Sequence, residues 1–205
     1  MDNLTDWSVN FDNVGNHGLG QILDEQWADA NRRFTQFIEK NYSVWMNEKE
    51  RPVMSPDILP KFIEKHLVDN EKIVLILMDC LRTDQLKAMA GQLSQYFHIE
   101  MDYCLSILPS ATPYSRNAIF SGYFPLELQI KYPDLWPQMW ENEKSMNQFE
   151  EQFLKDYFSR NGLGSKSVRY HKILNYDEGN RLVNRIGEYK EIDILALVVN
   201  FVDSL

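Results

Sequence analysis

Cysteine is scarce in this chain of 205 residues, which contains only Cys80 and Cys104. Two distant cysteines exclude a disulfide-rich scaffold. Each lies in or beside a segment that we expect to form a buried strand, so we interpret both as structural thiols in a reducing cytoplasm. Basic side chains are also few: 21 Lys and Arg face 30 Asp and Glu, a net charge of −9. This balance argues against a broad nucleic-acid surface but permits a local pocket for one or two phosphates.

Long hydrophobic runs are absent as well. No apolar stretch reaches the roughly 18 residues that a membrane helix needs, and residues 1–20 are polar and acidic, without the apolar core of a signal peptide. A hydrophobic fraction of 44% and an aromatic fraction of 13% exclude wholesale disorder. We therefore expect a cytoplasmic protein without membrane insertion, built as one domain with an appendage.

Several common motifs are missing too. The chain has no G-x-x-x-x-G-K-[ST] loop and no G-x-G-x-x-G after a strand, so the sequence does not support a P-loop or a dinucleotide-binding fold. It also has no G-x-S-x-G nucleophile elbow, so the sequence does not support an α/β-hydrolase. The four histidines show no spacing typical of metal ligands. We expect His17, His66 and His98 to be structural or solvated.

The N-terminal third reads as an appendage. Residues 1–20 predict an irregular lead-in, and residues 21–70 a helical arm or linker. Within that arm a long helix is expected from about 22 to 48, because apolar residues recur in steps of three and four, with Asn41 as the one interruption: Trp27, Ala30, Phe34, Phe37 and Val44. Prolines then break the chain before a short helix at 61–67. The long helix serves either as an arm that forms a homodimer or as a layer packed on the sheet.

Residues 71–205 read as an α/β domain. Four segments predict strands: the apolar run 73–78, the segments 99–108 and 168–173, and the run 194–202. Helices are expected at 84–96, at 113–120, after a capping box at Ser145 and Gln148, and at 179–186. Thr83 and Thr112 are the expected N-caps of the first two helices. The aromatic-rich stretch 123–140 suits a lid or insertion. This alternation is typical of a wound, mostly parallel sheet with flanking helices.

Polar side chains follow three of the predicted strands. Asp79 comes directly after 73–78, Thr112 follows 99–108, and Asp203 follows 194–202. Open α/β sheets bind ligands at the carboxyl edge of their strands, so we expect these three residues to meet there. Two carboxylates at one edge repel each other unless a cation lies between them, which predicts a metal site. The alternative is that each residue only caps a turn.

Thr112 precedes Pro113, which suits the first turn of a helix. A helix start attracts phosphate, and a hydroxyl there becomes a nucleophile if a metal lowers its pKa. Arg116, one turn later, is placed to hold a phosphate oxygen, and Arg82 is a second, weaker candidate for bracing the site.

The motifs Met78-Asp79-Cys80-Leu81-Arg82, Ala111 to Arg116 and Phe120-Ser121-Gly122 resemble the PglZ domain of the alkaline phosphatase superfamily. The resemblance covers residues 72–205, and residues 21–67 resemble the segment before that domain in PorX-type response regulators of the type IX secretion system. It implies an alkaline-phosphatase-like fold with two zinc ions and phosphodiesterase activity on cyclic or linear oligonucleotides. It also implies a sensor kinase and secretion-system proteins as partners.

Residue by residue, the resemblance assigns Asp79 as the first metal-ligating aspartate, Thr112 as the metal-contacting nucleophile and Asp203 as the start of a D-x-x-x-H motif. The histidine of that motif would fall beyond Leu205, so we expect this chain to be a truncated, inactive part of a longer enzyme. The Thr-Pro-Tyr-Ser-Arg sequence departs from the C/S-x-P-x-R pattern of sulfatases and argues against sulfate esters. Two alternatives stay open: a non-catalytic signalling output domain, and phosphomonoesterase or phosphoglycerate-mutase-like chemistry.

Overall fold

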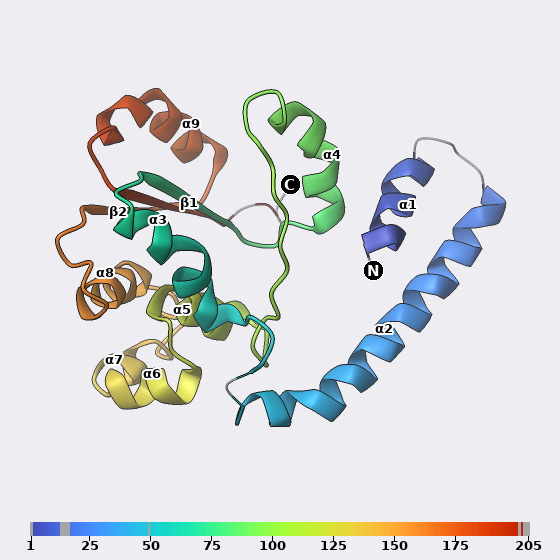
Figure 1. Cartoon of the computed structure of the whole chain (residues 1–205), viewed down its shortest axis with the longest axis horizontal. Coiled ribbons are helices and arrows are strands. Elements are labelled where there is room, and N and C mark those ends of the chain that lie inside the picture. Colours follow the sequence, from blue (N-terminus) through green and yellow to red (C-terminus); the bar gives the residue numbers. More distant parts are fainter. Residues whose placement is uncertain (1, 13–16, 49, 201, 203–205) are drawn as a thin grey trace. The chain divides into compact units, whose positions relative to one another are not determined.

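The computed structural model describes residues 2–12, 17–48, 50–200 and 202. They divide into two compact units, Met1–Arg51 with Cys80–Asp102, and Pro52–Asp79 with Tyr103–Leu205 (Figure 1). All of the described candidate site residues except Arg82 belong to the second unit.

Three helices make up the first unit: α1 (Asp2–Asp12), α2 (His17–Trp45) and α4 (Thr83–Leu93). The indole N–H of Trp27 donates to the Ser8 hydroxyl at 3.1 Å, and Lys87 pairs with Asp6 at 2.7 Å. These contacts tie α1 to α2 and to α4. The expectation of an irregular lead-in was therefore wrong for residues 2–12. Tertiary contacts stabilise a helix there that the sequence pattern does not predict.

The long helix is confirmed, although it begins earlier than expected, at His17. Its apolar stripe is largely exposed: Phe34 is 41% exposed and Phe37 is 50% exposed. Among the described helices, none is long and apolar enough to cross a membrane.

The second unit is built on three strands, β1 (Ile73–Met78), β2 (Val168–Ile173) and β3 (Ile194–Val199). They form a wholly parallel sheet in the order β1-β3-β2, with Ile194 in register with Ile73 on one side and with Val168 on the other. The wound parallel sheet with flanking helices and a preceding helical segment is thus confirmed.

One face of this sheet carries the main core. Helices α3 (Glu64–Val68), α5 (Thr112–Ser121) and α8 (Glu150–Arg160) lie on it (Figure 1), together with the π-helix η2 (Leu59–Ile63). The short 3₁₀ helix η1 (Ser55–Asp57) precedes η2. Phe120, Phe153 and Phe158 are buried there against Ile194, Ala196 and Val198. The predicted linker helix at 61–67 matches the end of η2 and the start of α3.

The opposite face is covered by α9 (Tyr176–Asn184) and the turn η3 (Ile186–Tyr189). Leu182 and Tyr189 pack there against Ile173, Leu195 and Leu197. The β1 side of the same face has no such cover among the described residues of this unit, since Val74 is 57% exposed and Ile76 is 55% exposed.

Four local expectations were wrong. Residues 99–108, all of which the structure describes, form no strand, and Leu105 makes an isolated parallel bridge to Met54. The N-caps of α4 and α5 are Arg82 and Ala111, so each threonine lies one residue inside its helix. Helix α8 begins at Glu150 rather than behind Ser145, whose hydroxyl bonds to the Asn142 carbonyl instead. Both cysteines are exposed and neither lies in a strand.

The stretch 123–140 folds into α6 (Pro125–Lys131) and α7 (Leu135–Gln138). Leu128 and Met139 from this stretch are almost fully buried in the main core. It therefore helps to cover that core and is not a detached flap.

Candidate functional site

The site lies at the carboxyl edge of the sheet, where the three strands end level with one another. The Asp79 amide donates to the Val199 carbonyl at 2.9 Å, and the Asn200 amide donates to the Ile173 carbonyl at 3.0 Å. The ladder therefore continues one residue past β1 and β3. This brings the side chains of Asp79 and Asn200 to the same edge, as the parallel topology predicts.

The start of α5 is held rigidly beside this edge. The Asn117 side-chain amide donates to the Pro113 carbonyl at 2.6 Å and to the Met146 carbonyl at 2.8 Å. The Ser115 hydroxyl donates to the Ser110 carbonyl at 3.2 Å. These bonds connect the first turn of α5 to the loop before it and to the segment before α8, so the backbone at Thr112 is fixed from two sides.

Arg116 joins helix and sheet. Its guanidinium donates to both carboxylate oxygens of Glu150, at 2.8 and 2.7 Å. Its Nη1 also donates to Asp79 Oδ2 at 3.0 Å and to Asn200 Oδ1 at 2.7 Å. The Arg116 side chain is only 4% exposed. A planar guanidinium is suited to this geometry because it can make a bidentate pair on one edge and further bonds on another.

Glu150 is the buried counter-ion of this cluster, and its side chain is 1% exposed. Its carboxylate also accepts from the Tyr170 hydroxyl at 2.6 Å and from the Asn147 amide at 3.1 Å, and Lys172 Nζ lies 3.8 Å away. A buried carboxylate needs such a set of donors, since an unpaired one would carry a large desolvation cost. The four contacts therefore complete a satisfied polar network beneath the strand ends.

The network shifts the pKa of its members. For Arg116, burial alone would lower the pKa, but the charges and hydrogen bonds of Glu150 and Asp79 outweigh it and the pKa is raised. Burial, reinforced by the Glu150 charge, raises the pKa of Tyr170 far above its usual range. Burial lowers the pKa of Lys172, although Glu150 opposes that shift. At neutral pH the cluster thus holds a neutral phenol and a charged guanidinium.

Three of the predicted site residues, Asp79, Thr112 and Arg116, are brought into this region, because Arg116 ties α5 directly to Asp79. Asp203 lies outside the described residues. Thr112 is half-buried, and its hydroxyl makes no hydrogen bond to any residue that the structure describes. Arg82 pairs instead with its neighbour Asp84, and its side chain is 71% exposed.

The described residues do not by themselves hold a metal ion. Within the described ranges no group of three or more His, Cys, Asp or Glu side chains is arranged to coordinate one. At the strand ends Asp79 is a hard oxygen donor of the type zinc accepts, and its side chain is 23% exposed, but Glu150 is fully engaged by Arg116. The fit to the expected metal site is therefore partial, resting on Asp79 and the nearby Thr112 hydroxyl.

The sequence reasoning missed Glu150, Tyr170 and Asn200. Glu150 had a readable signal, because it shares the helix face of Phe153, Leu154 and Tyr157, so a carboxylate was placed on a buried stripe. Asn200 follows the last apolar strand as Asp79 follows the first. The role of Tyr170 was not readable, since alternation places it on the core face without naming its partner.

Comparison with known protein families gives two matches. Residues 58–205 match the BREX system PglZ alkaline phosphatase-like domain, and residues 1–46 match the PorX response regulator linker domain. A search of curated protein sequences gives no significant match. The two matches follow the order linker, then effector, of a response regulator. Because the first match spans well over half of the residues, the chain belongs to the PglZ family of alkaline phosphatase-like domains.

Proposed function

We propose that this chain contributes Thr112 and Asp79 to a zinc-dependent phosphodiesterase site that acts on cyclic or linear oligonucleotides, as the effector of a response regulator. The observation that supports it most is the link from Arg116 to Asp79, which fixes the start of α5 at the carboxyl edge of the sheet. A hydroxyl at a helix start beside a strand-end carboxylate suits phosphoryl transfer.

Thr112 is the proposed nucleophile. Its Oγ forms a bond to phosphorus while the bond from phosphorus to the leaving oxygen breaks. The proton of the threonine hydroxyl passes to bulk water, and the leaving alkoxide takes up a proton from bulk water. Water then cleaves the phosphothreonine ester and restores the hydroxyl. No described side chain is hydrogen-bonded to the Thr112 hydroxyl as a general base, so a metal held at this edge would have to lower the pKa of the hydroxyl. Zinc would supply that effect and would shield the charge on the phosphate.

Asp79 is proposed as a metal ligand, with Asp203 as a second. Arg116 was expected to hold the phosphate, and that role stays a prediction. Its buried bidentate bond to Glu150 favours a different one, in which Arg116 positions the Asp79 carboxylate and the first turn of α5. Lys172, whose Nζ lies 3.8 Å from Glu150 and whose side chain is 30% exposed, is a second cation among the described residues of this cluster.

The test is hydrolysis of bis(p-nitrophenyl) phosphate by the full-length protein with added zinc. We expect Thr112→Ala to lower turnover at least about 1,000-fold and Thr112→Ser to retain part of it, because serine keeps the hydroxyl. Lys131→Ala, on the exposed side of α6, is the matched control and should keep the wild-type rate. Equal rates for Thr112→Ala and the wild type would exclude Thr112 as the nucleophile.

A second candidate is a non-catalytic output domain that binds a partner or a nucleotide. It is favoured by the partial ligand set within the described residues and by the engagement of Arg116 with protein groups. Zinc binding without any turnover, on diester and monoester substrates alike, would support this candidate. Turnover confined to monoesters would point instead to phosphomonoesterase chemistry.

A further inference from the structure

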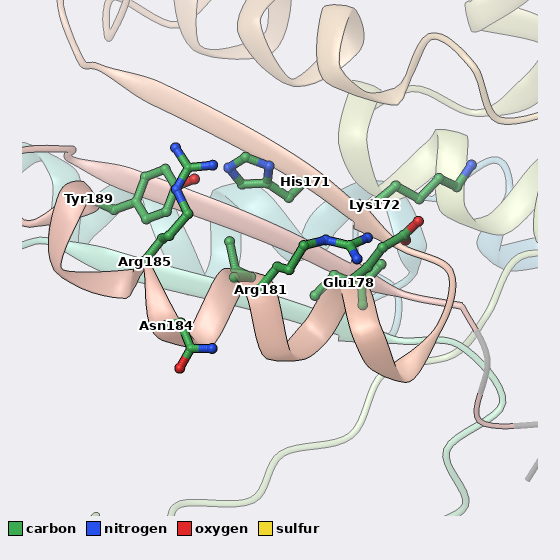
Figure 2. Close-up of a pocket in the computed structure, with 9 residues that line it drawn as sticks. His171, Lys172, Glu178, Arg181, Asn184, Arg185 and Tyr189 are labelled. Atoms are coloured by element: carbon green, nitrogen blue, oxygen red, sulfur yellow. The ribbon is translucent and has the colours of Figure 1, made fainter.

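A pocket lies on the other face of the sheet from α5, between strand β2 and helix α9 (Figure 2). Its volume is about 390 Å³, which is within the usual size of small-molecule sites. Leu182 of α9 packs against Leu195 and Leu197, whereas α5 packs on the side of Ile194 and Ala196. Successive residues of β3 point to opposite faces, so this pocket is separate from the Thr112 site.

Two arginines line the pocket. Arg181 lies on α9, and Arg185 is the C-cap residue directly after that helix. Arg185 is paired with Glu188, but the guanidinium of Arg181 has no ion pair or hydrogen bond to any described residue. Arg181 is therefore available to a ligand.

A polar atom without a partner lies in the same wall. His171 Nε2 is buried and makes no hydrogen bond within the described part of the chain. Its ring packs edge-on against Tyr189, with ring centres 5.1 Å apart. Figure 2 shows His171, Tyr189 and Arg185 gathered at one end of the pocket, while the amine of Lys172 points away from α9. Buried polar atoms are usually satisfied, so an unsatisfied one beside a pocket points to a missing partner.

The lining also shows which kind of anion fits. Glu178 is the one carboxylate among the lining residues, and its Oε2 already accepts from the Leu174 amide at 2.7 Å. The tyrosine ring of Tyr189 and the side chain of Leu182 offer flat and apolar surface beside the two guanidiniums. A bare phosphate would leave most of this volume unused, whereas a nucleotide places its phosphate on arginine and its base on an aromatic ring.

We propose that the pocket between β2 and α9 binds a nucleoside monophosphate, with its phosphate between Arg181 and Arg185 and its base against Tyr189. His171 Nε2 supplies a further polar contact. This site is independent of the phosphodiesterase proposed above, and it gives the chain a place to sense a small nucleotide outside the Thr112 site.

The test is titration of the full-length protein with AMP, adenosine and inorganic phosphate, followed by calorimetry and by NMR of the histidine side chains. We expect AMP to bind at least about tenfold more tightly than either fragment and to shift the His171 ring signals, identified with His171→Gln. His66 and His98 should not shift. Arg181→Gln should weaken AMP binding about tenfold or more, while Lys131→Gln, which removes one positive charge from α6, should not.

Other results would overturn the proposal. Equal affinity for phosphate and AMP would mean a simple anion site. Unchanged AMP binding in Arg181→Gln, with its loss in Thr112→Ala, would place the nucleotide in the Thr112 site instead. Arg181 is exposed on a surface helix, so its replacement should leave the fold intact, and a matching circular dichroism spectrum checks that. AMP binding that survives Thr112→Ala but not Arg181→Gln would support the pocket even if the phosphodiesterase proposal failed.

Discussion

The buried Arg116–Glu150 pair makes the energetic role of the site measurable. Arg116→Met leaves the Glu150 carboxylate, 1% exposed, without its bidentate partner and removes a bond from Asp79. Breaking one partner of a buried pair typically costs about 3–5 kcal/mol, because the remaining charge is left uncompensated. We expect Arg116→Met and Glu150→Met each to lower the free energy of unfolding by about that amount in urea titrations.

The double variant separates the pair from its surroundings. Replacing a whole buried pair by apolar residues is often nearly neutral. The loss in free energy of unfolding for Arg116→Met/Glu150→Met should therefore be smaller than the sum of the two single losses, by at least about 2 kcal/mol. Some loss remains, since the Tyr170 hydroxyl and the Asn147 amide also lose their acceptor.

The chain contains its own control. Arg185 and Glu188 form a pair of nearly the same geometry, at 2.9 and 2.7 Å, but their side chains are 64% and 56% exposed. Arg185→Met should therefore cost far less stability than Arg116→Met, because an exposed ion pair is screened by solvent. The reasoning would be refuted if Arg116→Met cost no more than Arg185→Met, or if the two buried changes simply added.

Three further predictions concern the fold. Gly122→Ala should lower the free energy of unfolding by about 2 kcal/mol or more, because Gly122 has φ +64° and an added Cβ would meet the Tyr157 ring at 2.6 Å; an unchanged thermal melt would count against this. Hydrogen bonds from the Ser167 amide and hydroxyl lower the pKa of Asp193. The stabilisation from these bonds should be full above about pH 3.8, the unfolded pKa, and should be lost as pH falls through the lower pKa of the folded state. Asp193→Asn should abolish that part of the acid dependence in urea titrations at several pH values. Phe34→Asp, on the exposed stripe of α2, should change thermal stability little and should weaken self-association in sedimentation if that stripe forms a dimer contact.

Long regular patterns in the sequence predicted the fold best. The apolar run 73–78 corresponds to β1, residues 194–199 of the run 194–202 correspond to β3, and the three-four spacing corresponds to α2. The segment 99–108 was mistaken for a strand because it has the right alternation. Strand formation also needs a continuous partner strand. Leu105 makes an isolated bridge to Met54, and the Ile107 amide bonds to the Ser55 hydroxyl. Helix α1 was missed because its own sequence has no clear helical pattern, and contacts to residues distant in sequence stabilise it.

The site was predictable only in part. Strand-end position singled out Asp79, and the Thr-Pro pair singled out Thr112, because both signals are local in sequence. The partner of Arg116 was not readable, since Glu150 lies 34 residues away and meets it only after α5 and α8 pack together. Position along the chain therefore identified the candidate site residues, but not which charged side chains pair with one another.

The most direct test of the central claim is to trap the intermediate on Thr112. The full-length protein is mixed with zinc and bis(p-nitrophenyl) phosphate, quenched in acid during turnover, digested and analysed by mass spectrometry. The account predicts a p-nitrophenyl phosphate ester on the peptide that contains Thr112, absent without zinc and absent in Thr112→Ala. Turnover with no adduct at Thr112, and with the same rate in Thr112→Ala, would contradict it.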